Sequence, residues 1–142
     1  MNLSEHFTFE ELTITDHREF DNTPNVEETE NLTRLAEFLE QVKTVLGGKP
    51  IMVNSAFRSE AVNNAVGSRN TSQHRIGCAA DIRVPGMTPD EVVKAVIASG
   101  IGYDQIIREF DRWTHISIPN TKDMTPRRQA LIIDKSGTRQ YV

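Results

Sequence analysis

The chain is 142 residues long, a length that suits one domain around a single hydrophobic core, and we expect residues 1–142 to form that domain. Its net charge of −4, with 37% apolar and 25% charged residues, is ordinary for a globular protein and includes no basic run dense enough for nucleic acid. The lone cysteine excludes an internal disulfide and a zinc site built on paired cysteines, and no apolar run reaches the ~20 residues that span a bilayer.

The first third of the sequence predicts helices. Thr8 and Glu11 have the spacing of a capping box, so we expect a short helix to begin there. Residues 21–25 are turn-forming and include a proline, which stops that helix from continuing. The strongest helical pattern covers residues 26–46, where leucines and valines recur at steps of three and four along one face, and a pair of glycines ends it.

Strands dominate the later part of the chain. A second capping box, at Thr88 and Glu91, predicts a helix that ends at Gly100 and buries Val96 and Ile97, and a shorter helix is expected at residues 60–66. Because helices come early and strands late, the sequence predicts an α+β domain with a mainly antiparallel sheet. The predicted strands are residues 50–55, a segment that runs into residues 82–84, and residues 105–108, 114–118 and 129–133.

One segment, residues 72–81, concentrates chemically useful side chains. It places an imidazole at His74 and a carboxylate at Asp81, with a glycine and small residues between them that let the backbone turn tightly into a strand. A second imidazole, His115, lies where polar and apolar residues alternate as in a half-buried strand. Taken singly, these residues are more often structural, as hydrogen-bonded core histidines and an aspartate that caps a turn. Together they favour Zn²⁺, whose catalytic sites use such ligands and keep one position open.

A zinc hydrolase also needs a proton acceptor and a group that stabilises an oxyanion. If the strands on either side of residues 110–112 are antiparallel, Glu109 ends one strand and shares a face with His115, whereas Asp111 belongs to the turn and is the fallback base. Arg58 follows a buried strand, and its planar guanidinium suits a substrate carboxylate or an oxyanion. The alternative for Arg58 is a surface ion pair with Glu60.

These residues also resemble a known family. The pattern Ser72-x-His74-x-x-Gly77-x-Ala79-x-Asp81, followed by Trp113-x-His115, is similar to the M15 peptidases, which include zinc D-Ala-D-Ala carboxypeptidases, dipeptidases and some phage endolysins. The resemblance extends over nearly the whole chain and is strongest to a compact phage or VanY-like branch of the family. The further segments that carry it are residues 4–12, the turn at residues 22–24, and residues 55–59 and 104–107.

The resemblance implies both a fold and a set of site residues. The implied fold is the α+β arrangement of hedgehog and D,D-peptidase domains, in which a mainly antiparallel sheet carries the zinc site and helices pack against it. The implied metal ligands are His74, Asp81 and His115. Arg58 would polarise the substrate or bind the oxyanion, and Ser72 would contact the substrate.

The position of the base departs from many relatives. They carry the catalytic carboxylate three residues before the last histidine, where this chain has Arg112. In the compact branch a glutamate lies slightly earlier, which points to Glu109. We therefore expect a zinc metalloprotease that hydrolyses an amide bond in the peptidoglycan stem peptide. It would act as a D,D-carboxypeptidase or an endopeptidase, with a bacteriophage endolysin as one possible form.

The expected partners are stem peptides, without nucleic acid or membrane, and a monomer is the default for a compact domain of this size. The first residues lack the basic and apolar segments of a secretory signal. We therefore expect synthesis in the cytoplasm and action at the cell wall after release, for example through a phage holin. The alternative function is a module that retains the metal but only binds the cell wall, or a structural phage component.

Overall fold

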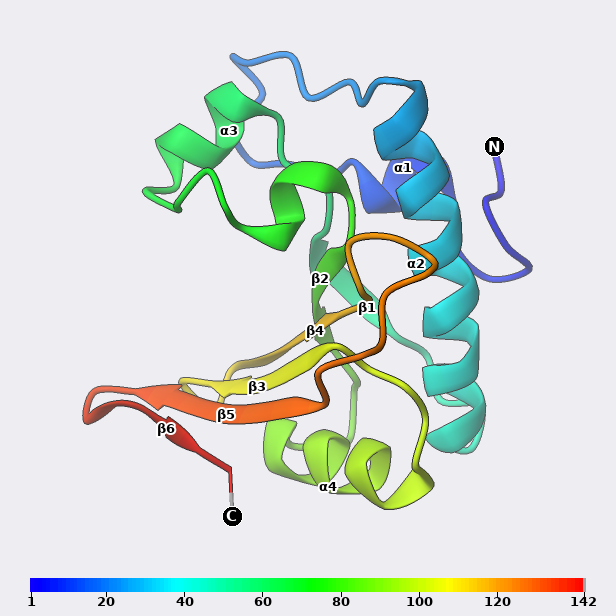
Figure 1. Cartoon of the computed structure of the whole chain (residues 1–142), viewed down its shortest axis with the longest axis vertical. Coiled ribbons are helices and arrows are strands. Elements are labelled where there is room, and N and C mark those ends of the chain that lie inside the picture. The colour runs from blue at the N-terminus through cyan, green and yellow to red at the C-terminus, as the bar shows by residue number, and fades with distance from the viewer. Residues whose placement is uncertain (142) are drawn as a thin grey trace.

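A computed structural model describes residues 1–141 and contains a six-stranded sheet in the order β1-β2-β4-β3-β5-β6 (Figure 1). The pairs β1/β2, β2/β4, β4/β3 and β5/β6 are antiparallel, and β3/β5 is parallel, so the prediction of a mainly antiparallel sheet is confirmed. The strands are β1 (Met52–Ser55), β2 (Ala79–Arg83), β3 (Gln105–Glu109), β4 (Trp113–Ser117), β5 (Gln129–Asp134) and β6 (Gly137–Gln140).

The predicted helices are also present. Both predicted capping boxes form, and Asn25 and Glu28 make a third one at the start of the longest helix. None of the helices within residues 1–141 is long and apolar enough to cross a membrane. The helices are α1 (Phe9–Leu12), α2 (Val26–Val45), α3 (Glu60–Ala65), α4 (Pro89–Ser99) and the short 3-10 helix η1 (Gln73–Ile76).

The two faces of the sheet have different partners. Side chains alternate along a strand, so Ile82, Ile106 and Ile116 share one face, where they join the hydrophobic core with α2 and α4. Asp81 and His115 therefore lie on the opposite face, towards which η1 contributes His74. The sheet thus separates the main core from the polar residues that the sequence singled out.

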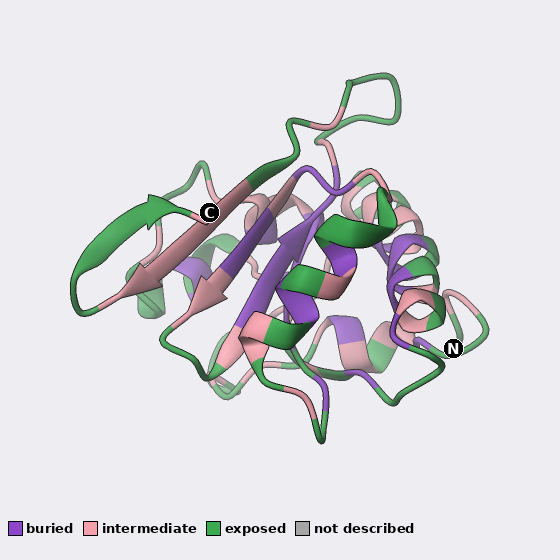
Figure 2. Cartoon of the chain, turned by 90° about the horizontal axis from the view of Figure 1, so that it is seen from below, coloured by how far each residue is buried: buried purple, intermediate pink, exposed green. Residues whose placement is uncertain are grey.

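The strands at the centre of the sheet are more buried than those at its edges. The central strands β2 and β4 are largely buried, whereas all four residues of β6 are exposed (Figure 2). The predicted stripe on α2 is buried, but the prediction for Ile97 is wrong. It lies in the last turn of α4, at the edge of the buried stripe formed by Val92, Val93 and Val96, and it is 37% exposed.

Candidate metal centre

Two neighbouring strands bring Asp81 and His115 together. In the antiparallel register of β2 and β4 these residues are directly opposite one another. Directly opposed residues share a face, with their Cβ atoms about 4.5–5.5 Å apart, so the backbone itself creates the contact. Nδ1 of His115 lies 3.0 Å from Oδ1 of Asp81.

His74 reaches the same carboxylate from η1. Ser72 caps this short helix, and its hydroxyl accepts a hydrogen bond from the backbone N–H of His74 at 3.2 Å. Gly77 ends η1 with φ at 82° and turns the chain into β2. A Cβ at Gly77 would lie 2.9 Å from the carbonyl oxygen of Glu28, so glycine is required for both conformation and space. The turn leaves Nε2 of His74 3.2 Å from Oδ1 of Asp81.

The second ring nitrogen of His74 determines its tautomer. Nδ1 lies 2.7 Å from the carbonyl oxygen of Ala56, which only accepts hydrogen bonds, so Nδ1 carries the hydrogen and donates it. When the ring is neutral, the Nε2 lone pair is directed towards the Asp81 carboxylate, and when the ring is protonated, Nε2 donates to that carboxylate. Lone pairs at 3.2 Å repel one another unless a proton or a metal cation lies between them. A backbone acceptor of this kind is the usual partner of a histidine that binds a metal.

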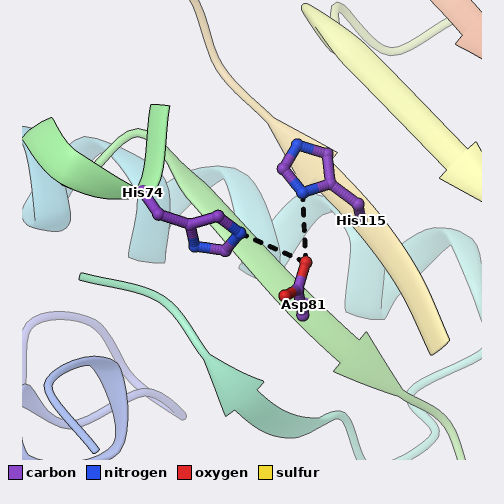
Figure 3. Close-up of side chains that lie close together, drawn as sticks. All are labelled: His74, Asp81 and His115. Carbon is purple, nitrogen blue, oxygen red and sulfur yellow. Dashed lines mark hydrogen bonds and ion pairs between the residues drawn. The ribbon is translucent and has the colours of Figure 1, made fainter. Parts of the chain in front are cut away.

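The side chains of His74, Asp81 and His115 lie close enough together to bind one metal ion (Figure 3). One atom each from His74, Asp81 and His115 lies within 4.8 Å of the other two, and all three residues are buried. Both imidazole nitrogens approach the same oxygen of Asp81. Asp81 lies inside a strand and does not cap a turn, which removes one structural explanation for it. The donor set fits Zn²⁺ with an open coordination position.

Asp81 is held in its ionised form. Burial raises the pKa of its carboxyl, but the charges and hydrogen bonds of His74 and His115 outweigh burial and hold that pKa well below its usual range. Nη2 of Arg58 donates to Oδ2 of Asp81 at 3.2 Å, and Nε of Arg58 donates to the hydroxyl of Ser55 at 3.2 Å. The alternative of a surface pair between Arg58 and Glu60 is therefore wrong, because Arg58 is directed into the site.

Glu109 lies at the edge of this group. It ends β3 directly opposite Trp113, two residues before His115 on β4, so it shares the face that carries the candidate metal ligands. Burial raises the pKa of the Glu109 carboxyl, and the negative charge of Asp81 raises it further. His115 and Arg58 act in the opposite direction but do not cancel the shift. Because Glu109 shares the face of His115, its carboxyl is placed to interact electrostatically with the candidate ligands.

Asp111 lies apart from the group. It occupies the turn between β3 and β4 with φ at 53°, and its side chain is 67% exposed. Its carboxylate pairs with Nε of Arg108 at 2.9 Å. Arg108 belongs to the face of the sheet opposite Glu109, so this ion pair holds the fallback base away from the candidate metal ligands.

Two groups that orient side chains of the site were not predicted from the sequence. The carbonyl of Ala56 orients His74, and the hydroxyl of Ser55 supports the guanidinium of Arg58. Ser55 lies three residues before Arg58, a spacing that could have suggested the contact. The role of Ala56 depends on a backbone atom, for which a sequence carries no signal.

Comparisons with known proteins agree with this geometry. A family model described as Peptidase M15 matches residues 5–117, a span that contains all three metal-binding candidates and leaves β5 and β6 outside. The zinc D-Ala-D-Ala carboxypeptidase of Streptomyces albus G is 43% identical over 44 residues. That segment is 31% of this chain and only 17% of the relative's length. Both comparisons point to Zn²⁺ as the metal.

Proposed function

Because the chain belongs to the M15 peptidase family, we propose that it is a zinc-dependent peptidase that hydrolyses an amide bond in the peptidoglycan stem peptide. The observation that carries this proposal is the convergence of three ligand atoms, from His74, Asp81 and His115, within 4.8 Å. The name of the Streptomyces relative supports a cell-wall substrate, since D-Ala-D-Ala is its stated target.

In this mechanism His74, Asp81 and His115 would hold the zinc. When bound, the metal would supply Lewis acidity and make water a better nucleophile at neutral pH. Glu109 accepts the proton as a water oxygen attacks the scissile carbonyl carbon, and it returns that proton to the nitrogen when the C–N bond breaks. A raised carboxyl pKa suits both steps, because Glu109 must take up a proton and then release it.

Arg58 is proposed to stabilise the oxyanion. Its guanidinium is already held beside Asp81, so the positive charge is in place before the negative charge develops on the substrate oxygen. Removing one such donor typically costs ~10²–10³-fold in kcat, which sets the expected effect of Arg58→Ala. Ser72 remains a proposed substrate contact, supported by its position beside His74.

We propose a D,D-peptidase with the hedgehog-type arrangement of sheet and helices, acting either as a carboxypeptidase or as an endopeptidase. Release from a phage-infected cell and action at the wall as an endolysin is part of the same proposal. The specific support is the 43% identity to a carboxypeptidase in the shared segment. A module that binds the wall without turnover is the competing function.

Digestion of purified sacculi by the zinc-loaded protein tests the proposal. We expect new amino groups and altered muropeptides, which mass spectrometry would identify as loss of a terminal D-Ala, cleavage of a cross-link, or cleavage between L-Ala and D-Glu. Glu109→Gln should lower product formation by ~10²–10⁴-fold while zinc remains bound. Binding to sacculi without any product would support the competing module, and full activity after zinc removal would reject the mechanism.

A further inference from the structure

Arg58 belongs to a segment, residues 56–59, that has no regular secondary structure. A long arginine side chain reaches a reproducible position only if its own backbone is held. Part of that support comes from the site itself, since the backbone N–H of Arg58 donates to the carbonyl of His74 at 2.9 Å. The backbone N–H of Phe57 donates to the carbonyl of Leu12 at 2.9 Å.

The side chain of Asn22 holds the groups on either side of Arg58. Its Nδ2 donates to the carbonyl of Phe57 at 3.1 Å and to the carbonyl of Thr13 at 3.0 Å. Its Oδ1 accepts from the backbone N–H of Ser59 at 2.7 Å. Only a carboxamide offers donors and an acceptor together in this geometry. Asn22 therefore contacts both chain neighbours of Arg58 while anchoring the loop before α2.

We propose that Asn22 is a positioning residue for Arg58 in the hydrolytic reaction. By holding the backbone of Phe57 and Ser59, Asn22 keeps the guanidinium of Arg58 directed at Asp81 and at the place where the oxyanion forms. This inference rests on the proposed function, because it assigns Asn22 to the step that Arg58 performs. The competing role is purely structural, in which Asn22 only ties residues 13–22 to the rest of the chain.

Loss of the hydrogen bonds from Asn22 to Phe57 and Ser59 should affect kcat more than KM or zinc content. Without the Asn22 side chain, the carbonyl of Phe57 and the N–H of Ser59 form hydrogen bonds with water instead. The guanidinium of Arg58 then spends less time beside Asp81. A displacement of about 1 Å can cost ~10²-fold in rate, so we expect Asn22→Ala to lower kcat by ~10–100-fold. Asn22→Asp should be equally impaired, because it retains the acceptor for Ser59 but turns a carboxylate oxygen towards two carbonyls.

A double-mutant cycle with Arg58→Ala separates the two roles. If Asn22 acts through Arg58, Asn22→Ala lowers kcat in the zinc-loaded wild type but changes it less than about 3-fold in the Arg58→Ala background. Additive losses would overturn the inference. Asn25→Ala is the matched control, because it removes the side-chain cap on the N–H of Glu28 and lowers stability without touching residues 56–59.

A second readout does not depend on catalysis. Nitrogen NMR of the Nε–H of Arg58, which is bonded to Ser55, should show a shifted or broadened resonance in Asn22→Ala and in Asn22→Asp, but not in Asn25→Ala. An unchanged resonance in the Asn22 variants would overturn the inference even if the wild type proved inactive. Inactivity of the wild type with zinc bound would count against the proposed function alone.

Discussion

Asp81 and Asp104 are two buried carboxylates of the same region, 8% and 4% exposed, and both have a pKa below the usual range. Their surroundings differ in kind. Asp104 accepts from the backbone N–H and the guanidinium of Arg127 at 2.9, 3.0 and 2.7 Å, and from the amide of Gln73 at 3.1 Å. All of these groups carry their hydrogens permanently.

Among residues 1–141, Asp81 has one permanent side-chain donor, Arg58 at 3.2 Å. Its other two neighbours are the ring nitrogens of His74 and His115, which donate only when they are protonated. Such nitrogens can give up a proton and bind a cation instead. We infer that the permanence of the donors, and not burial or charge alone, distinguishes the structural carboxylate of Asp104 from the candidate metal ligand Asp81.

The largest effect is expected from Asp81→Asn. The change removes the negative charge with little change of shape, so zinc should be lost and activity should fall by at least ~10³-fold, since metal Lewis acidity is worth several kcal/mol. Metal analysis and muropeptide digestion measure both quantities. Asp104→Asn should retain its zinc, and retention of zinc and activity by Asp81→Asn would break the distinction between the two carboxylates.

Glu109→Gln should lower kcat by ~10²–10⁴-fold with zinc still bound, because a general base contributes about that factor. The matched change, Asp111→Asn, alters an exposed turn residue and should leave kcat within about 3-fold of wild type, as is usual for residues outside the reacting group. Kinetics on an isolated stem peptide would measure both variants. Equal losses in the two variants would contradict the assignment of the base.

Asp104→Asn should act on stability. The change weakens the hydrogen bonds that Asp104 accepts from Arg127 and Gln73. Because the Arg127 side chain is 54% exposed, we expect a loss of only ~1–3 kcal/mol in unfolding free energy. Thermal unfolding with and without zinc checks this prediction. Added zinc should raise the melting temperature of wild type and of Asp104→Asn, but not that of Asp81→Asn.

The smallest effect concerns the titration of Glu109. Its pKa in the folded metal-free protein should exceed the ~4.3 of a free glutamate, and zinc should lower it because a cation favours the carboxylate. A raised pKa means that Glu109 stabilises the fold at low pH and that this contribution is lost as pH rises through the folded value. Carbon NMR of the side-chain carboxyl tests the direction. A pKa below that of a free glutamate would be inconsistent with the burial of Glu109.

Local patterns predicted much of this molecule. The apolar stripe on α2 and the capping boxes at Thr8 and Thr88 depend on residues close in sequence, and they appear as expected. The edge strand β6 was not predicted, because its four residues are all exposed and carry no alternation of apolar and polar side chains. The parallel pairing of β3 with β5 depends on the path of residues 118–128, which no local pattern specifies.

The site was predictable to a different extent. The spacing of His74, Asp81 and His115 was enough to suggest a metal, and the pairing of β2 with β4 places two of them opposite each other. Asn22 was read only as part of a turn. Its contacts are with backbone atoms 9 to 37 residues away, and a single sequence does not show which backbone groups a side chain will meet.

Zinc K-edge absorption spectroscopy on the protein loaded with one equivalent of Zn²⁺ tests the central claim most directly. We predict nitrogen and oxygen ligands at about 2.0–2.1 Å, with the scattering of two imidazoles and no sulfur. A sulfur shell at ~2.3 Å, which would come from Cys78, would contradict it. An unchanged spectrum in the double variant His74→Ala/His115→Ala would contradict it equally.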